Sequence, residues 1–415
     1  MTMMTMQHLA RLALGLFAIA GPALAAQVDI LDLEDGDVVP GKYIVSLKPA
    51  VDIAAHLGWV RDIHKRSLDL CATAGLEKSF SFAGFSAYTG EFDDGTIAKI
   101  LADVNVLSVE QDRVGRISAL TQQGNAPWGL ESISSRNPIT DTKTRGHTYS
   151  YDSTAGNGTF AYVLDSGVLT NNTEFNGRAI KGYNTWNGTE SFDDHFGHGT
   201  HVAGTIGAET YGVAKQTTII DVKVVRSVGY STLSHVIDGI NWVVNNVTNT
   251  PGRAGKSVIN MSLAFSTSTT LNRAVDAATA AGILSVVGAG NDGALASTRS
   301  PASASTSLTV GAISSNRTRA SFSNYGSCVD VFAPGVDVAS LWNEEGVESI
   351  LSGTSMSSPH VAGLALYLMA LETSLDEPGK VKKRITELAV SDVVVNAGDG
   401  SPNLLAFNGI TVPTY

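Results

Sequence analysis

The chain has 415 residues, of which 43% are hydrophobic, and a formal net charge of −11. This length allows more than one domain and a sizeable core. The acidic balance, without any basic cluster, argues against nucleic acid or an anionic membrane as a partner.

The first residues have the pattern of an export signal. A single Arg precedes an apolar stretch over 12–20, and Ala23-Leu24-Ala25 offers small residues for cleavage. The stretch meets Gly21-Pro22 too soon to span a membrane. A buried helix is the alternative, but no polar residues alternate along the stretch. We therefore expect a signal peptide over 1–26, cut after Ala25 or Ala26, and a secreted, extracellular protein.

Residues 27–118 are more densely charged than the region after them, with 15 acidic and 9 basic residues. Apolar alternation and helical periodicity predict two helices and about four strands. The clearest are strands at 41–48, 80–88 and 106–110 and helices at 54–70 and 96–102. This set predicts a small α+β domain, with one sheet backed by helices.

From Gly158 onward, buried apolar runs alternate with segments of helical periodicity. The runs predict parallel strands at 160–164, 219–225, 258–263, 283–287 and 308–313. The periodic segments predict helices at 200–209, 231–247 and 271–281, the second capped by Ser231. Strand and helix in alternation predict an α/β fold, a three-layer sandwich with a mostly parallel central sheet.

Asp165 directly follows the apolar run 160–164. It is therefore expected at the carboxyl end of a central strand, where open α/β sheets gather their sites. A carboxylate there can accept a hydrogen bond from an imidazole and hold its tautomer. An Asp that only starts a turn before Gly167 is the alternative.

His198 stands at the start of the next predicted helix, between Gly197 and Gly199. The two glycines let other chain segments approach the imidazole closely. His201 would lie near the same face one turn later, so sequence makes His198 a preference and not a proof. We expect His195 and His360 to be solvated or structural.

Ser355 follows Gly353-Thr354 and starts a predicted helix over 356–371. A hydroxyl needs a base to take its proton, and a helix start stabilises a developing oxyanion. Pro359 is tolerable if it falls in the first turn, where backbone N–H groups have no partner. The rivals are Ser352, Ser357 and Ser358. Because position 357 is Ser, the segment is not the Gly-x-Ser-x-Gly elbow of α/β-hydrolases.

Asp165, His198 and Ser355, in this order and within their local motifs, resemble the triad of the subtilisin family of serine proteases. The chain is most similar to the fungal proteinase K subfamily. The resemblance implies an endopeptidase that hydrolyses polypeptides through an acyl-enzyme and needs no cofactor for catalysis. It also implies His198 as base, and Asn291 with the N–H of Ser355 as donors to the oxyanion.

Two other hypotheses compete with this one. Residues 288–293 match the Gly-x-Gly-x-x-Gly of a dinucleotide site, but 296–307 is rich in Ser, Thr and Pro, and no acid appears until Asp330. That hypothesis fails. A catalytically inactive subtilisin fold that binds a partner is the rival from another class, and the presence of all four catalytic residue types argues against it.

Residues 27–118 resemble the prodomain of secreted subtilisins, especially in Tyr43-Ile44-Val45 and Val109-Glu110-Gln111-Asp112. The resemblance implies a zymogen whose prodomain acts as intramolecular chaperone and inhibitor. A freestanding inhibitor and an accessory domain that stays attached are the alternatives.

The segment 119–130 resembles the mature start of fungal proteases, which implies cleavage at Ser118–Ala119 and a peptidase domain over 119–415. Cys71 then leaves with the prodomain. Cys328 remains unpaired, and we expect it to be a small buried side chain. We expect the product to be a monomer.

The substrate is expected to bind as an added strand along Ser262-Leu263-Ala264, which resembles the Ser-Leu-Gly segment of the family's cleft. Ala264 departs from that Gly. Gly229 would edge the other side, in a loop shorter than that of proteinase K. Small residues at Gly288 and Gly290 predict a primary pocket that admits large apolar or aromatic groups.

A calcium site is the last expectation. Segments 300–303 and 322–326 resemble the frame of a calcium site in proteinase K. There Asp330 would give a carboxylate, and Ser305 and Ser307 their carbonyls. Oxygen ligands suit calcium, but one carboxylate is little charge. A solvated Asp at a strand edge is the alternative, so structural calcium stays open.

Overall fold

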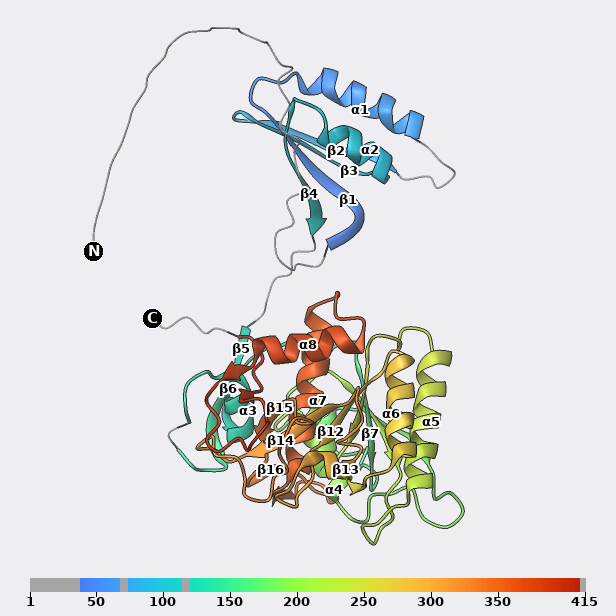
Figure 1. Cartoon of the computed structure of the whole chain (residues 1–415), viewed down its shortest axis with the longest axis vertical. Helices are drawn as coiled ribbons and strands as arrows, with labels where there is room; N and C mark the ends of the chain where they lie inside the picture. Colours follow the sequence, from blue (N-terminus) through green and yellow to red (C-terminus); the bar gives the residue numbers. More distant parts are fainter. Residues whose placement is uncertain (1–37, 68–73, 114–119, 140, 411–415) are drawn as a thin grey trace, which may run out of the picture. The chain divides into compact units, whose positions relative to one another are not determined.

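The computed structural model describes residues 38–67, 74–113, 120–139 and 141–410. The chain divides into two compact units with the boundary between Gly115 and Arg116 (Figure 1). This boundary falls just before the expected cut at Ser118–Ala119. The expected signal peptide, Cys71 and the cut itself lie outside the described residues.

The first unit has a four-stranded antiparallel sheet in the order β2-β3-β1-β4. Its elements are β1 (Val38–Leu47), α1 (Ile53–Ser67), β2 (Gly75–Phe82), β3 (Phe85–Glu91), α2 (Asp94–Leu101) and β4 (Val106–Arg113). Side chains of both helices and of the sheet form one core, among them Val45, Val60, Ile100 and Val109. The predicted α+β architecture is confirmed.

The single strand predicted over 80–88 is wrong. The structure has two strands there, β2 and β3, joined by a two-residue turn at Ala83 and Gly84. Their φ angles are 46° and 83°, and positive φ at both positions matches the twist of a tight hairpin. The period-two alternation of apolar residues continues through the turn, and Ala83 is not a residue type that favours positive φ, so the turn was not predicted.

The second unit has a nine-stranded sheet in the order β18-β19-β15-β14-β12-β10-β7-β9-β8. Every neighbouring pair is parallel except β18 with β19. The strands are β7 (Phe160–Asp165), β8 (Ala179–Asn184), β9 (Thr218–Lys223), β10 (Ser257–Met261), β12 (Leu284–Gly288), β14 (Leu308–Ile313), β15 (Val331–Pro334), β18 (Val390–Ser391) and β19 (Leu404–Leu405). The prediction of a mostly parallel sheet is confirmed.

Helices cover both faces of this sheet, and each face has its own core. In β7, Ala161 and Val163 belong to one core and Tyr162 and Leu164 to the other, as period-two strands require. One core includes α3 (Trp128–Ser134), α4 (His198–Gly207), α7 (Thr354–Leu371) and α8 (Pro378–Leu388); the other includes α5 (Leu233–Asn249) and α6 (Thr269–Ala280), side by side in Figure 1. The three-layer sandwich is confirmed.

Short elements complete this unit. Antiparallel pairs form between β5 (Leu120–Pro127) and β6 (Arg145–Asp152), β11 (Phe265–Ser266) and β13 (Arg299–Ser300), and β16 (Val338–Leu341) and β17 (Glu348–Leu351). Two 3₁₀ turns span Thr173–Phe175 and Ala296–Thr298. Cys328, expected to be buried, is only half-buried at the edge of the core beside α5 and α6. No helix among the described residues is both long and apolar enough to cross a membrane.

One further local prediction fails, and helix α8 was not predicted. The cap of α5 is Thr232 and not Ser231: Thr232 accepts from the N–H of His235, while the Ser231 hydroxyl donates to the carbonyl of Val224. Helix α8 was missed because five of its 11 residues are charged and its buried stripe, at Val381 and Ile385, is narrow.

The order of the strands defines where a site can form. The chain places β8 and β9 on one side of β7, then crosses to β10 and continues outward through β12, β14 and β15. Between β7 and β10 the order reverses, and ligands bind open α/β sheets at the carboxyl ends beside such a reversal. Asp165 ends β7, and Ser262 directly follows β10.

Candidate active site

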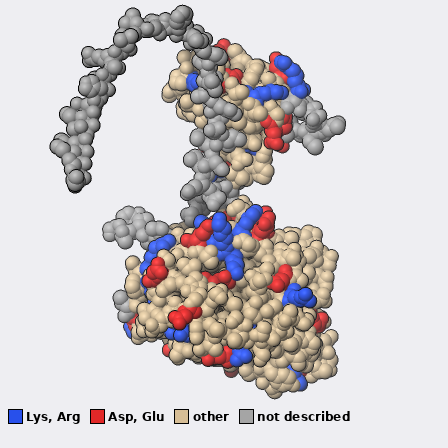
Figure 2. Space-filling model, viewed as in Figure 1, with Lys and Arg blue, Asp and Glu red and all other residues tan. Residues whose placement is uncertain are grey.

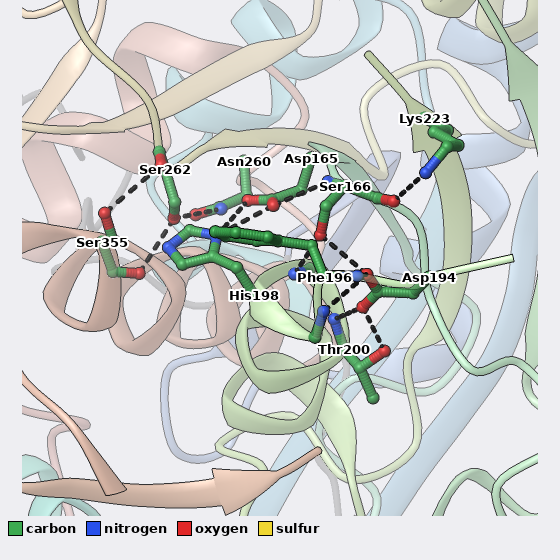
Figure 3. A network of polar contacts seen from close by, with 12 residues as sticks. Asp165, Ser166, Asp194, Phe196, His198, Thr200, Lys223, Asn260, Ser262 and Ser355 are labelled. Atoms are coloured by element: carbon green, nitrogen blue, oxygen red, sulfur yellow. Dashed lines mark hydrogen bonds and ion pairs between the residues drawn. The ribbon is translucent and has the colours of Figure 1, made fainter. Parts of the chain in front are cut away.

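Asp165, the last residue of β7, reaches His198, the first residue of α4 (Figure 3). Nδ1 of His198 lies 2.8 Å from Oδ1 and 3.0 Å from Oδ2 of Asp165. Gly199 makes this approach possible, since a Cβ there would overlap the carbonyl oxygen of Gly167. The prediction that glycines let neighbouring segments approach His198 is confirmed.

The environment of His198 favours its charged form. Burial lowers the pKa of His198, but the charge and hydrogen bond of Asp165 and the charge of Asp194 outweigh that effect. The pKa is therefore held above its ordinary value. A base with a raised pKa accepts a proton more readily, although it is neutral only at a correspondingly higher pH.

Asp194 anchors the segment that carries His198. Its buried carboxylate accepts from the hydroxyls of Ser166 (2.9 Å) and Thr200 (2.6 Å) and from the N–H groups of Phe196 (3.1 Å), Gly197 (2.8 Å) and Thr200 (2.9 Å). The first amides of α4, which have no partner within the helix, thus receive a charged acceptor. This role has no signature in the sequence, because Asp194 lies three residues before the N-cap Gly197 and not at the cap itself.

Ser166 connects the carboxylate of Asp194 to the pair formed by Asp165 and His198. Its N–H donates to Oδ1 of Asp165 at 2.7 Å, and its hydroxyl accepts from the N–H of Gly199 at 2.9 Å while donating to Asp194. Its carbonyl accepts from the buried ammonium of Lys223. Asp165 and His198 are therefore held by one continuous hydrogen-bond network, drawn in Figure 3.

The other histidines lie apart from Asp165. His201 is fully buried, its Nε2 is 3.1 Å from the carbonyl of Val338, and burial lowers its pKa to about 3. His360 is buried against the carbonyl of Met356 at 2.8 Å, and burial lowers its pKa to about 4. His195 is exposed. Of the four, the structure pairs His198 with Asp165.

Ser355 is the second residue of α7, and Figure 3 shows His198 between Ser355 and Asp165. Its hydroxyl donates to the carbonyl of Ser262 over 3.3 Å. The N-cap is Gly353, which offers no side chain to the first N–H groups of the helix. Among the first amides of this helix, the N–H of Ser355 has no acceptor among the described contacts, so it can donate to another group.

Pro359 does not lie in the first turn, as predicted, but is the sixth residue of α7. A proline there leaves the carbonyl four residues earlier without its helical donor. That carbonyl belongs to Ser355, and the hydroxyl of Ser262 donates to it at 2.9 Å. The hydroxyl of Ser262 accepts in turn from Nδ2 of Asn260 at 2.9 Å. Ser262 therefore supports the helix turn that carries Ser355.

Asn291 has a fixed amide orientation. Its Oδ1 accepts from the N–H of Thr354 at 2.8 Å and from its hydroxyl at 2.9 Å. A Cβ built on Gly353 would lie 3.3 Å from Nδ2 of Asn291 and 3.6 Å from the N of Ser355. The two nitrogen donors therefore border one space, which stays open because residue 353 has no side chain.

A cavity of about 420 Å³ collects most of the predicted residues. It is lined by Asp165, Phe196, His198, Val225, Gly229, Tyr230, Ser231, Ser262, Leu263, Ala264, Phe265 and Ser355. Sequence analysis missed Phe196, Val225 and Phe265, which lie outside the recognised motifs. Gly288 and Gly290 do not line this cavity: a Cβ on Gly288 would lie 2.9 Å from Oγ1 of Thr354, and one on Gly290 would overlap Nδ2 of Asn324.

The fold and this site together define a serine hydrolase with a mostly parallel α/β fold. Comparison with known proteins identifies its family. Residues 156–406 match the Subtilase family, and residues 42–118 match Peptidase inhibitor I9. The chain therefore belongs to the subtilase family. It is a subtilisin-like serine protease with an inhibitor-type propeptide.

Relatives match over nearly their full length. The chain is 48% identical to an alkaline proteinase of Hapsidospora chrysogena, over 97% of this chain and 99% of the relative. It is 46% identical to the subtilisin-like proteinase Mp1 of Magnaporthiopsis poae, over 96% and 98%. The crystal structure of a cold adapted subtilisin-like serine proteinase matches with a TM-score of 0.62 and 40% identity, covering 68% of this chain and 98% of that one.

The expected calcium residues are only partly brought together. Asp330 and Ser307 lie on either side of the ammonium of Lys382, which is 2.9 Å from Oδ2 of Asp330 and 2.6 Å from the carbonyl of Ser307. Of Ser305, whose carbonyl was the expected ligand, the hydroxyl donates to Asp276 at 3.2 Å. Within the described ranges, no three His, Cys, Asp or Glu side chains gather where they could hold a metal ion. With the ammonium of Lys382 between these oxygens, the residues present do not fit calcium at this place.

Proposed function

We propose that this chain is the precursor of a secreted endopeptidase in which Asp165, His198 and Ser355 form the catalytic triad. The observation that carries the proposal is the 2.8 Å pair of His198 with Asp165 in the same cavity as Ser355. Ser355 would exchange its long bond to Ser262 for one to Nε2 of His198, as apo sites tighten on binding substrate.

The reaction then proceeds in two similar halves. His198 takes the proton of Ser355 as Oγ attacks the peptide carbonyl, and Asp165 stabilises the imidazolium. The imidazolium protonates the leaving amine, which departs and leaves an acyl-enzyme on Ser355. Water, deprotonated by His198, attacks the ester, and the imidazolium returns that proton to Oγ of Ser355 as the new carboxyl end is released. No step requires a cofactor.

Nδ2 of Asn291 and the N–H of Ser355 would receive the oxyanion of each tetrahedral intermediate. Their support is the open space that both nitrogens border beside Gly353, at the positive end of α7. Thr354 holds the amide of Asn291 in place beforehand, so no reorganisation is needed as the charge develops.

Broad specificity with a preference for aromatic and large aliphatic residues before the cut follows from the cavity lining. Its side chains include Phe196, Val225, Tyr230, Leu263 and Phe265. The one carboxylate of the lining, Asp165, already accepts from His198 and Ser166, so it is not free to pair with Lys or Arg of a substrate. Main-chain pairing along 262–264 would supply affinity without side-chain choice.

Maturation is proposed to remove 1–26 on export and 27–118 by self-cleavage at Ser118–Ala119, leaving 119–415 as the peptidase. The match of 42–118 to Peptidase inhibitor I9 and the unit boundary beside Arg116 support this order. Until it is degraded, the prosegment would act on its own peptidase as chaperone and inhibitor.

One experiment tests the proposal. The chain is expressed with its leader, and the medium is tested for casein cleavage, labelling by a fluorophosphonate, and the N-terminus of the product. We expect activity, a label on Ser355 and an N-terminus at Ala119. A panel of peptide nitroanilides ending in Phe, Leu, Ala, Arg or Glu then tests specificity.

Particular results would contradict the proposal. A folded product without labelling or cleavage would make the chain an inactive binding protein. Preference for Arg over Phe and Leu would overturn the proposed specificity. A Ser355→Ala variant still cut at Ser118–Ala119 would assign maturation to another protease.

A further inference from the structure

A lysine from α8 lies where the resemblance led us to expect a calcium ion. Lys382, the fifth residue of this helix, reaches Asp330, which directly precedes β15, and Ser307, which directly precedes β14. Its ammonium contacts Oδ2 of Asp330 at 2.9 Å and the carbonyl of Ser307 at 2.6 Å. Figure 2 shows basic and acidic side chains gathered over α8.

Neighbouring hydrogen bonds hold Asp330 and Ser307 in place. The N–H of Thr309 donates to Oδ2 of Asp330 at 2.9 Å, and the N–H of Asp330 donates back to the carbonyl of Thr309 at 2.9 Å. The hydroxyl of Ser307 is taken by the carbonyl of Ala304 at 2.9 Å. The side chains of Lys382 and Asp330 are only 28% and 22% exposed. The ammonium therefore lies in a preformed, largely shielded set of acceptors.

Calcium does not fit beside this ammonium. The ion takes six to eight oxygens at about 2.3–2.6 Å, whereas the ammonium occupies the point between the two strongest oxygen ligands expected here. A second cation at that point would be repelled by the lysine charge. One lysine also neutralises one aspartate, whereas calcium with Asp330 alone would leave an excess positive charge.

We propose that the ammonium of Lys382 replaces a structural calcium ion between Asp330 and Ser307, so that this protease carries the cation covalently on α8. The lysine ties three segments, α8 and the starts of β14 and β15, that are 75 residues apart at the extremes. Folding at this corner then requires no metal, and removing the lysine exposes a vacant oxygen site that calcium can enter.

The test uses the full chain in a Ser355→Ala background, which prevents self-digestion. Thermal unfolding of the peptidase unit is followed in excess EDTA, in millimolar calcium and in millimolar magnesium. The variants are Lys382→Met, Asp330→Asn and their double. Lys380→Met, on the same helix and paired with exposed Asp376 at 2.9 Å, is the matched control.

In EDTA we expect Lys382→Met to lower Tm by about 2–6 °C and Lys380→Met by less than about 1 °C. Calcium should recover most of the loss in Lys382→Met, and magnesium should not, because it dehydrates reluctantly and demands octahedral geometry. The double variant should show no such recovery. With Lys382 present, Asp330→Asn should lower Tm equally in EDTA and in calcium.

Two results would overturn the proposal. Calcium could raise Tm of the Lys382 chain by an increment that Asp330→Asn abolishes, which would place the metal beside the lysine. Alternatively, Lys382→Met could fold stably and show the same Tm in EDTA and in calcium. If Lys382→Met does not fold, the comparison of Asp330→Asn with its parent in EDTA and calcium still decides, because it tests the same carboxylate with the lysine in place.

Discussion

The two helices that carry His198 and Ser355 begin in opposite ways. At the start of α4, the carboxylate of Asp194 accepts from the N–H groups of Gly197 and Thr200. At the start of α7, the cap is Gly353, and no side chain accepts from the N–H of Ser355 among the described contacts. The start of α4 is capped by a negative charge, whereas at the start of α7 no charged side chain accepts from the amides.

The difference matches the charge that would develop beside each helix start during hydrolysis, which is positive on His198 at α4 and negative on the oxyanion at α7. A carboxylate near His198 offsets the positive end of the α4 dipole and favours the imidazolium that forms there. The start of α7 has no charged acceptor, so it keeps its dipole, and the N–H of Ser355 remains available to the oxyanion. A helix N-terminus can therefore lie beside a positive or a negative charge. With a bound carboxylate it is compatible with the imidazolium, and without one it stabilises the oxyanion.

The largest expected effect comes from removing either side chain that reacts. Ser355→Ala and His198→Ala should each lower kcat by about 10⁶-fold, and the double variant should be no worse, because the members act as one unit. His201→Ala, the control on the same helix, should keep measurable turnover, since His201 contacts Val338 and not Asp165. Steady-state kinetics on a nitroanilide measure all four, and a fully active His198→Ala would refute the assignment.

Next in size is the loss of the side-chain donor at the start of α7. Asn291→Asp keeps an oxygen to accept from Thr354 but removes the Nδ2 donor, so kcat should fall by about 10²–10³-fold with little change in KM. Ser352→Ala, beside the same helix start, serves as the control and should retain activity. A change in KM alone would mean that Asn291 binds substrate and not the oxyanion.

Filling the open space should have a smaller effect. In Gly353→Ala the added methyl would lie 3.3 Å from Nδ2 of Asn291 and 3.6 Å from the N of Ser355. We expect kcat to fall by about 10–100-fold, through crowding and displacement of the donors. The rate of fluorophosphonate labelling should fall with it, because that reagent also places an oxygen there. Unchanged labelling would show that the oxyanion forms elsewhere.

The smallest effect is a shift of pH dependence at the start of α4. Activity requires neutral His198, so the acid limb of kcat/KM follows its pKa. The charge of Asp194 raises that pKa, so Asp194→Asn should move the acid limb to lower pH. Ser166→Ala removes a hydrogen bond to Asp194 without changing charge, and its limb should stay in place. An unmoved limb in Asp194→Asn would leave Asp194 a purely structural role.

Much of the fold was readable because its signals are local. The apolar runs that became β7 and β14 are buried on both faces, so their composition alone marks them. The hairpin turn was missed because its first residue, Ala83, is not a type that favours positive φ. Helix α8 was missed because its buried stripe is narrow, with only Pro378, Val381 and Ile385 buried. The triad candidates were found through short motifs, whereas Asp194 was not, because a buried carboxylate without ligand spacing has no sequence signature.

By itself, the sequence determined most of the strand and helix order, the family and the residues able to do the chemistry, since each depends on neighbours along the chain. Only the tertiary structure decided which distant groups meet. Pro359 leaves the carbonyl of Ser355 without its helical donor, and the hydroxyl of Ser262, 93 residues away in the chain, donates to it instead. Lys382 donates to the carbonyl of Ser307 across 75 residues. Such partners are chosen by how strands and helices cross, because a buried polar group must be satisfied by whatever the packing brings to it.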